Sequence, residues 1–248
     1  MILTSKNNAL IKETASLKEK KGRKQHGLFL VEGRKMATEC LRSGLEIERI
    51  FLAESYAKEM PFDETLTVRV SDDVFRHLSD EKTPQGILCR VKIPVYSLQK
   101  PTGRALLLDG VSDPGNMGAI IRTANAAGYN EIYLTDDCTD PYSPKSVRAS
   151  MSGLFFTKIY FGTRENIFSA LGDTPIFVGD MDGENVFQLD VQGNFALAIG
   201  NEGNGISEAV FQRATKRVKI PMQSEQESLN AAVSAGILMY ALCKNQFN

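Results

Sequence analysis

Cysteine and histidine are scarce in this sequence, and the few present are not arranged for metal binding. The four cysteines stand at positions 40, 89, 138 and 243, without a C-x-x-C pair and without histidines at ligand spacing. We therefore expect no structural zinc or other metal ion, and scattered free thiols are typical of the reducing cytoplasm. Only two histidines, His26 and His77, are available for a catalytic triad.

Long apolar runs are also missing. No run reaches the roughly 20 residues of a membrane-spanning helix, and the first residues, MILTSKNNALIKET, lack the apolar core of a secretory signal. The chain has 248 residues, of which 42% are hydrophobic and 24% charged, as in soluble globular proteins. We expect a cytoplasmic protein of one large or two small domains that does not associate with a membrane.

Positive charge is concentrated near the start of the chain. The net charge is −1, yet residues 1–35 hold nine lysines and arginines against three acids, a net charge of +6, which leaves −7 for the remainder. The cluster KEKKGRKQHG (18–27) is dense enough to contact phosphate groups, although a solvated helix end and loop would have a similar composition. The asymmetry favours a nucleic-acid partner. The candidate RNA contacts are Lys20, Lys21, Arg23, Lys24 and Arg34.

Strand-like and helix-like segments alternate along the whole chain. Residues 1–93 are expected to form a small α/β domain, and PVYSLQKPTGR (94–104), with two prolines and a glycine between strand-like runs, is the expected linker. In residues 105–248 the repeated β–α order predicts a mainly parallel sheet covered on both faces. The helices expected in the first domain span 7–20, 34–43 and 72–78, and Ser71 is the expected N-cap of the last.

Residues 105–128 form the most informative unit of the second domain. ALLLD (105–109) is apolar up to a terminal acid, which predicts a buried strand that ends at a functional edge. A polar loop follows, and apolar residues at helical spacing then continue to Gly128, a good helix stop. Such loops lie where open α/β sheets bind ligands. Arg122 lies about one turn into the expected helix.

The loop GNEGNG (200–205) follows another expected strand. Its glycines lack Cβ atoms and so allow close approach of backbone and ligand. The spacing matches neither a Walker A loop nor the dinucleotide motif G-x-G-x-x-G, and Glu202 would repel a pyrophosphate. A neutral or cationic ligand fits better, and an ordinary turn between strand and helix is the alternative.

A third polar loop, PMQSEQESLN (221–230), leads into an apolar helix expected over 228–242. Ser228 and Asn230 lie at the start of this helix, where they either cap the backbone or point into a site. The helix is apolar on all sides and is therefore expected to be buried, either in the core or at a subunit interface.

The three loops together resemble a known family. DGVSDPGNMGAIIRTANAAG, AIGNEGNGIS and VKIPMQSEQESLNAAVSAGI are similar, in order and spacing, to the three signature motifs of the SpoU (TrmH-like) RNA ribose 2′-O-methyltransferases of the SPOUT superfamily. The intervening DPYSPKSVRASMSGLFF also resembles that family, so the likeness covers residues 104–243. KGRKQHGLFLVEGRKMATECL is similar to the small RNA-binding domain that many members carry.

This resemblance implies a fold and a cofactor that the residues alone do not. It implies a C-terminal α/β domain with a deep trefoil knot, a homodimer, and S-adenosylmethionine as methyl donor. The cationic sulfonium of S-adenosylmethionine suits a glycine loop that carries Glu202 and no lysine. By position in the motifs, the expected donor contacts are Gly200, Ile220, Met222 and Leu229.

The resemblance also assigns an active site, made of Asn116, Arg122, Glu202, Ser228 and Asn230. Family proposals make the arginine the general base. Because an arginine side chain stays protonated near pH 7, this role needs strong desolvation. The alternative for Arg122 is a cation that stabilises the developing alkoxide and binds a phosphate.

The substrate class is predicted from the domain organisation. A separate N-terminal domain is typical of family members that modify ribosomal RNA, and transfer RNA is the alternative. Two other functions stay open from the residues alone: a non-catalytic RNA-binding protein that uses the basic cluster, and a different nucleotide-using α/β enzyme. The missing G-x-G-x-x-G loop counts against the second.

Overall fold

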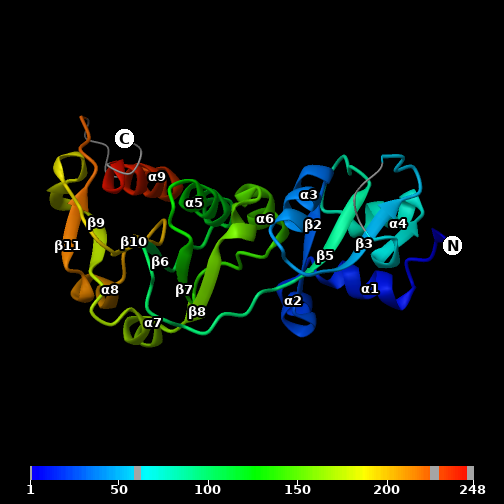
Figure 1. The fold of residues 1–248 in the computed structure, drawn as a ribbon, viewed down its shortest axis with the longest axis horizontal. Coiled ribbons are helices and arrows are strands. Elements are labelled where there is room, and N and C mark those ends of the chain that lie inside the picture. The colour runs from blue at the N-terminus through cyan, green and yellow to red at the C-terminus, as the bar shows by residue number, and fades with distance from the viewer. Residues whose placement is uncertain (1, 59–62, 224–228, 245–248) are drawn as a thin grey trace. The chain divides into compact units, whose positions relative to one another are not determined.

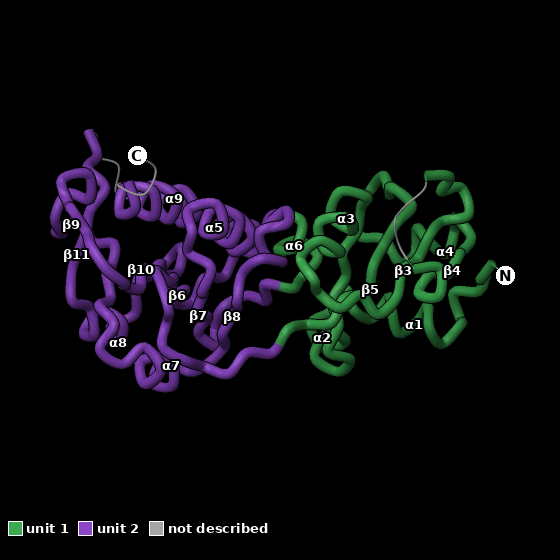
Figure 2. Tube along the Cα trace, viewed as in Figure 1, with its two compact units in different colours: residues 1–94, 142–148 green, residues 95–141, 149–248 purple. Residues whose placement is uncertain are grey.

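The computed structural model describes residues 2–58, 63–223 and 229–244 (Figure 1). The chain divides into two compact units (Figure 2). One consists of Met1–Pro94 with Tyr142–Arg148, and the other of Val95–Pro141 with Ala149–Asn248. Residues 142–148 thus pack within the first unit, although they lie in the middle of the second along the sequence. The ring of Tyr142 lies 5.0 Å from that of Phe29, and Arg148 bonds to Asp80 at 2.7 Å.

The first unit contains a five-stranded mixed sheet with the order β1-β4-β3-β5-β2. The first three strands in this order are parallel, and β5 runs antiparallel to both of its neighbours. The strands are β1 (Ile2–Leu3), β2 (Leu28–Glu32), β3 (Ile47–Ala53), β4 (Thr67–Val70) and β5 (Ile87–Lys92). The helices are α1 (Ala9–Ser16), α2 (Lys20–His26), α3 (Arg34–Arg42), α4 (Asp72–Leu78), a 3₁₀ turn Glu64–Leu66, and most of α6 (Pro144–Ser150).

The Ser71 prediction is confirmed. Its side chain accepts from the backbone N–H of Val74 at 3.4 Å and caps α4. Two acids in the first turn of α4 and two basic side chains in its last turn complement the helix dipole. The boundary of this helix could therefore be predicted because it depends on local residues only.

The expected helix 7–20 is wrong, because the chain turns between Ser16 and Lys20 and starts a second helix, α2. Gly22 of α2 lies so close to the end of α1 that a Cβ there would overlap the backbone of Ser16. Arg23 follows and is only 3% exposed. Its Nη1 donates to the carbonyls of Leu17 and Lys18, both at 2.8 Å.

This geometry corrects the assignment of Arg23 as an RNA contact. The carbonyls at the end of a helix lack intrahelical partners, and a buried guanidinium satisfies them. Arg23 therefore stabilises the junction of α1 and α2. The other four candidates, Lys20, Lys21, Lys24 and Arg34, are exposed.

The second unit contains a six-stranded sheet with the order β11-β9-β10-β6-β7-β8, in which every neighbouring pair is parallel. The predicted parallel sheet is confirmed. Its strands are β6 (Ala105–Asp109), β7 (Glu131–Thr135), β8 (Lys158–Gly162), β9 (Ile176–Asn185), β10 (Ala196–Gly200) and β11 (Lys216–Lys219). Its helices are α5 (Pro114–Ala126), α7 (Arg164–Leu171), α8 (Glu208–Arg213) and α9 (Ala231–Leu242), with 3₁₀ turns Gly153–Phe156 (η2) and Val186–Gln188 (η3).

Helices cover both faces of this sheet, as Figure 1 shows: α5 and α9 on one side, α7 and α8 on the other. Every residue of β6 is buried. Ala105 and Leu107 join a core cluster with α7 and α8, and because side chains alternate along a strand, Leu106 and Leu108 point toward α5 and α9. This explains why the ALLLD run has no polar position before its terminal acid.

Helix α9 begins at Ala231, with Asn230 as its N-cap. Part of this helix is exposed in the single chain. Burial in the core therefore does not explain why α9 is apolar on all sides. Val233 is 50% exposed and Tyr240 44% exposed. They lie seven residues apart, on one face of the helix.

Candidate active site

The loop after β6 is fixed by the start of α5. Gly110 takes the left-handed conformation, with φ of 72°. The side chain of Asp113 caps α5 by accepting from the N–H of Asn116 at 2.8 Å, and Pro114 occupies the first turn, where a missing N–H costs nothing. The loop therefore has one defined shape at the carboxyl end of the central strand.

Glu202, from the glycine loop, places its carboxylate at this helix start. It accepts hydrogen bonds from the N–H of Ser112 (3.0 Å), the hydroxyl of Ser112 (2.7 Å), the N–H of Asp113 (3.1 Å) and the side-chain amide of Asn116 (2.9 Å). Partial burial raises the pKa of Glu202, but the hydrogen bonds from Asn116 and Ser112 outweigh it and bring the pKa to about 2. The carboxylate is therefore ionised near pH 7 and is a weak proton acceptor.

Asn116 links the first and second motifs to the third. Its Oδ1 accepts from the side-chain amide of Asn230 at 3.0 Å. The Oδ1 of Asn230 in turn accepts from the N–H groups of Ala232 and Val233, at 2.9 and 3.2 Å. Asn230 thus caps α9 with its Oδ1 and bonds to Asn116 with its Nδ2. The predicted Ser228 lies outside the described residues.

The glycine loop closes on itself. The backbones of Asn201 and Gly205 exchange two hydrogen bonds of 2.9 Å. A Cβ on Gly200 would overlap the backbone of Gly205 and lie 2.5 Å from the nitrogen of Ile206. Asn201 holds the interior of the turn, since its Oδ1 accepts from the N–H groups of Gly203 and Asn204 and its Nδ2 donates to the carbonyl of Gly110. This role of Asn201 was not predicted, although asparagine is a typical residue for such a turn.

A cavity of about 960 Å³ lies beside this loop. Its walls come from the middle of β9, the carboxyl ends of β10 and β11, the segment after β11, and the first turns of α9. All four expected donor contacts, Gly200, Ile220, Met222 and Leu229, line it. The described lining residues carry two carboxylates, Asp180 and Glu202, against one ammonium, Lys219.

This lining fits the cofactor that the resemblance implies. A volume of this size is ample for a drug-sized ligand, the apolar side chains of Ile220 and Leu229 suit a flat heterocycle, and the excess of carboxylates suits a sulfonium cation. A phosphate-rich ligand fits poorly, because of the described lining residues only Lys219 would neutralise it.

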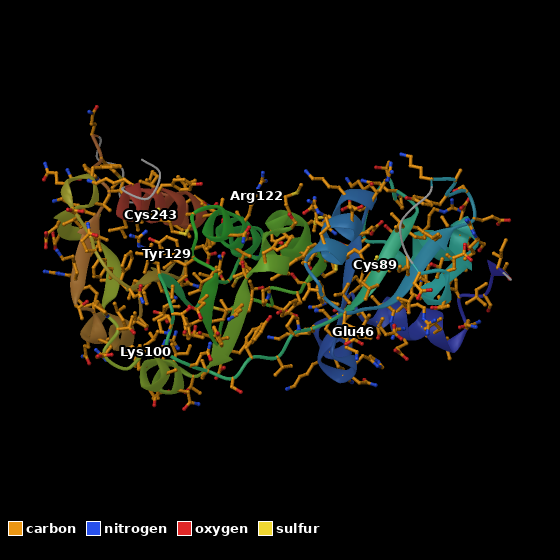
Figure 3. All side chains as sticks on the ribbon, in the orientation of Figure 1. Glu46, Cys89, Lys100, Arg122, Tyr129 and Cys243 are labelled. Atoms are coloured by element: carbon orange, nitrogen blue, oxygen red, sulfur yellow. The ribbon has the colours of Figure 1, made fainter. Side chains whose placement is uncertain are left out.

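Arg122 is not part of the Glu202–Asn116–Asn230 network. It lies six residues beyond Asn116 on α5, so its side chain points about 120° away around the helix axis. It is exposed, forms no hydrogen bond or ion pair with any residue that the structure describes, and extends from α5 into solvent (Figure 3). Its backbone is held from behind, because a Cβ on Gly153 of η2 would lie 2.9 Å from the Cα of Arg122.

Replacing Glu202 with glutamine is expected to remove a pH-dependent part of the stability. The folded pKa, about 2, lies below the reference value of 4.5, so this stabilisation is complete above pH 4.5 and is lost as the pH falls toward 2. The wild type should therefore exceed Glu202→Gln in free energy of unfolding at pH 6, by about 1 kcal/mol after allowance for solvent screening. Urea unfolding at several pH values between 6 and 3 measures the difference, and a difference independent of pH would contradict the prediction.

Residues 2–58, 63–223 and 229–244 show neither a metal-binding cluster nor a membrane-spanning helix. They contain no cluster of three or more histidine, cysteine, aspartate or glutamate side chains placed to bind a metal ion. None of their helices combines the length and apolar composition needed to cross a lipid bilayer.

Comparison with known proteins identifies relatives of both units. Residues 103–240 match the SpoU rRNA Methylase family, and residues 8–89 match the MRM3-like substrate binding domain. The chain is 29% identical to the 23S rRNA (guanosine(2553)-2′-O)-methyltransferase RlmP of Bacillus subtilis, covering 97% of this chain and 98% of that protein. It is 30% identical to the uncharacterized tRNA/rRNA methyltransferase slr1673 of Synechocystis, covering 99% of this chain and 94% of that protein.

A solved structure extends the likeness to the whole fold. The AdoMet-bound rRNA methyltransferase from Sinorhizobium meliloti has a TM-score of 0.88 and 26% identity, with 100% of this chain and 98% of that chain covered. The family match spans more than half of the sequence and contains the three loops that carry Asn116, Glu202 and Asn230. The chain belongs to the SpoU rRNA Methylase family.

Proposed function

We propose that this protein transfers the methyl group of S-adenosylmethionine to a ribose 2′-hydroxyl of ribosomal RNA. The observation that carries the proposal is the meeting of three distant loops, through Glu202, Asn116 and Asn230, at the rim of the cavity. The names of the relatives support the reaction and the substrate class.

S-adenosylmethionine, when bound, supplies an electrophilic methyl group. The protein must hold it, align a ribose hydroxyl with it and accept the hydroxyl proton. Backbone and apolar groups of the cavity, including Gly200, Ile220, Met222 and Leu229, hold the donor. Glu202, whose pKa of about 2 makes it a weak base, fixes the amide of Asn116 instead of taking the proton.

Of the five residues assigned to the active site, Arg122 and Glu202 have ionisable side chains, and Arg122 is proposed to act on the acceptor hydroxyl. It either accepts the proton after desolvation or stabilises the alkoxide as a cation. Ser228 keeps the active-site role that the resemblance implies. The exposed position of Arg122 suits contact with a large RNA substrate, since no described side chain blocks it.

Incubating the purified protein with methyl-labelled S-adenosylmethionine and RNA tests this function. Label in ribosomal RNA, mapped to a ribose 2′-oxygen, is the expected result. Label confined to transfer RNA would overturn the substrate class. RNA binding without donor binding, measured by calorimetry, would favour a non-catalytic RNA-binding protein.

The first domain (1–93) is proposed to bind the RNA substrate, joined by the linker 94–104 to the methyltransferase domain (105–248). The match to an MRM3-like substrate binding domain supports this assignment. Three lysines of α2, Lys20, Lys21 and Lys24, are exposed and lie within one short helix. Arg34, at the start of α3, is the fourth candidate.

Replacing Lys20, Lys21 and Lys24 together with alanine is expected to weaken RNA binding and flatten its salt dependence. Each lost phosphate contact reduces the slope of log K against log salt by about 0.7–0.9, so three contacts reduce it by roughly 2 to 3. Filter binding at several salt concentrations measures the slope. The matched control replaces three other exposed lysines of this unit, Lys6, Lys58 and Lys82. Equal slopes in the two triple variants would show that α2 has no special role.

A homodimer is proposed from the exposed apolar face of α9. Val233 and Tyr240 lie half-exposed on one side of a helix that packs on α5. A second copy of the chain on this face would bury both side chains. A sedimentation mass of one chain would contradict the dimer.

Two further features complete the proposal. The trefoil knot would thread the segment after β11 past the glycine loop, and the lining of one cavity by both segments supports it. An experimental chain trace that straightens when its two ends are pulled would contradict the knot.

A cytoplasmic location is supported by four buried cysteines without disulfide bonds. Fractionation that places the protein outside the cytoplasm would contradict this location.

A further inference from the structure

A partly buried ion pair lies beside the glycine loop, outside the proposed machinery. The side chain of Asp109, at the carboxyl end of β6, is 0% exposed. Arg164, the first residue of α7, approaches it with Nη2 at 2.6 Å and donates from Nε to Oδ1 at 2.7 Å. Neither residue lines the cavity. A buried carboxylate needs such a cation, because an uncompensated charge in this position is strongly destabilising.

The same pair holds the end of the glycine loop. The second carboxylate oxygen of Asp109 accepts from the N–H of Ser207 at 2.7 Å, and the Nε of Arg164 also lies 3.1 Å from the Ser207 hydroxyl. Ser207 is the residue directly after the Gly200–Ile206 stretch and caps α8. The guanidinium has a further partner in the exposed Asp137, at 2.7 Å.

The other end of the loop is tied to the same strand. Gly200 pairs with Asp109 in the register of β10 and β6, and Asn201 donates to the carbonyl of Gly110 at 2.8 Å. The loop that carries Glu202 therefore leaves β10 beside the end of β6 and returns to the end of β6 within eight residues. Its return point, Ser207, is held by Asp109, and Asp109 is held by Arg164.

We infer that Arg164 is a positioning residue: through Asp109 and Ser207 it keeps loop 200–207 in the shape that forms one wall of the cavity and sets Glu202 against Asn116. The effect of Arg164 on donor binding rests on the proposed function, whereas its effect on the shape of loop 200–207 does not. The fork of the guanidinium is essential because one group reaches Asp109, Ser207 and Asp137 together. A lysine offers a point charge and cannot make all three contacts.

Hydrogen exchange of the backbone amides tests the effect on the loop without any ligand. In Arg164→Ala, the N–H groups of Gly205 and Ser207 should exchange at least about tenfold faster, equivalent to about 1.4 kcal/mol. Arg164→Lys, which keeps the charge and guards against a failure to fold, should lie between this variant and the wild type. Lys100→Ala, which removes an exposed ion pair with Asp173 in the same unit, is the control and should exchange like the wild type.

Calorimetry then tests the effect on the site. Arg164→Ala should bind S-adenosylmethionine about tenfold more weakly, within the range of coupling through a packed network, and should bind RNA as the wild type does. Unchanged exchange in loop 200–207 in both variants of Arg164 would overturn the inference. Faster exchange with unchanged donor affinity would also overturn it, since the loop would then not shape the cavity. A wild type that binds no donor would instead refute the proposed function and leave the exchange result standing.

Discussion

Replacing Arg122 with alanine is expected to lower kcat for RNA methylation by about 10²–10⁴-fold, the usual contribution of a positioned acid–base or electrostatic group. The affinity for S-adenosylmethionine should stay within about twofold. The reason is structural: Arg122 does not line the cavity, is exposed, and has no hydrogen bond or ion pair among the described residues. Its removal should therefore neither unfold the protein nor disturb the donor site.

Single-turnover kinetics and calorimetry measure the two quantities separately. Lys158→Ala, an exposed basic residue on the edge strand β8, is the matched control and should leave both unchanged. Arg122→Lys separates the two proposed roles of the guanidinium: near-normal activity would rule out any role that depends on its shape. If kcat falls and donor affinity falls equally in Arg122→Ala, the placement of Arg122 on the acceptor side is wrong.

Replacing Gly200 with alanine is expected to lower the affinity for S-adenosylmethionine by more than about 100-fold, equivalent to about 2.7 kcal/mol. A Cβ at this position overlaps the backbone of Gly205 and lies 2.5 Å from the nitrogen of Ile206. These are backbone atoms and cannot move aside as a flexible side chain can, so the Asn201–Gly205 turn must open. Overpacking of this kind also lowers stability by about 1–3 kcal/mol.

The same loop provides the control. At Gly203 the nearest atom to an added Cβ is the Oδ1 of Asn201, at an ordinary 3.5 Å. Gly203→Ala should therefore cause a much smaller loss, within about threefold, because no backbone atom has to shift. Calorimetric titration of both variants with S-adenosylmethionine measures the two affinities. Similar affinities in the two variants would mean that the closure of the loop does not determine donor binding.

Much of the site could be predicted because its signals are local. A strand of five apolar residues that ends in an acid, a helix start with proline, and glycines in a tight turn are each encoded within a few neighbours. Asn116, Glu202 and Asn230 were assigned by resemblance to motifs, and the structure brings these three together through hydrogen bonds of 2.9 and 3.0 Å. No local rule predicts that residues 86 and 114 positions apart along the chain bond to each other.

Tertiary contacts overturned one prediction made from charge and decided between two alternatives that hydropathy had left open. Arg23 stands in a dense basic cluster, yet the end of α1 required a buried donor and Arg23 supplies it. Helix α9 is apolar on all sides, yet the sheet covers only part of it and leaves Val233 and Tyr240 exposed. In both cases the composition of the segment does not reveal whether a given side chain faces solvent or packs against a neighbouring element.

By itself, the sequence determined the alternation of strands and helices, the parallel sheet, the caps and the three motif loops, because these depend on residues within a few positions of one another. Only the tertiary structure decided which side chains meet. It separated Arg122 from the Glu202–Asn116–Asn230 network, packed residues 142–148 into the first unit, and placed Arg164 beside the glycine loop. The physical reason is that packing and ion pairing depend on the distance between side chains in space, which their separation along the chain does not determine.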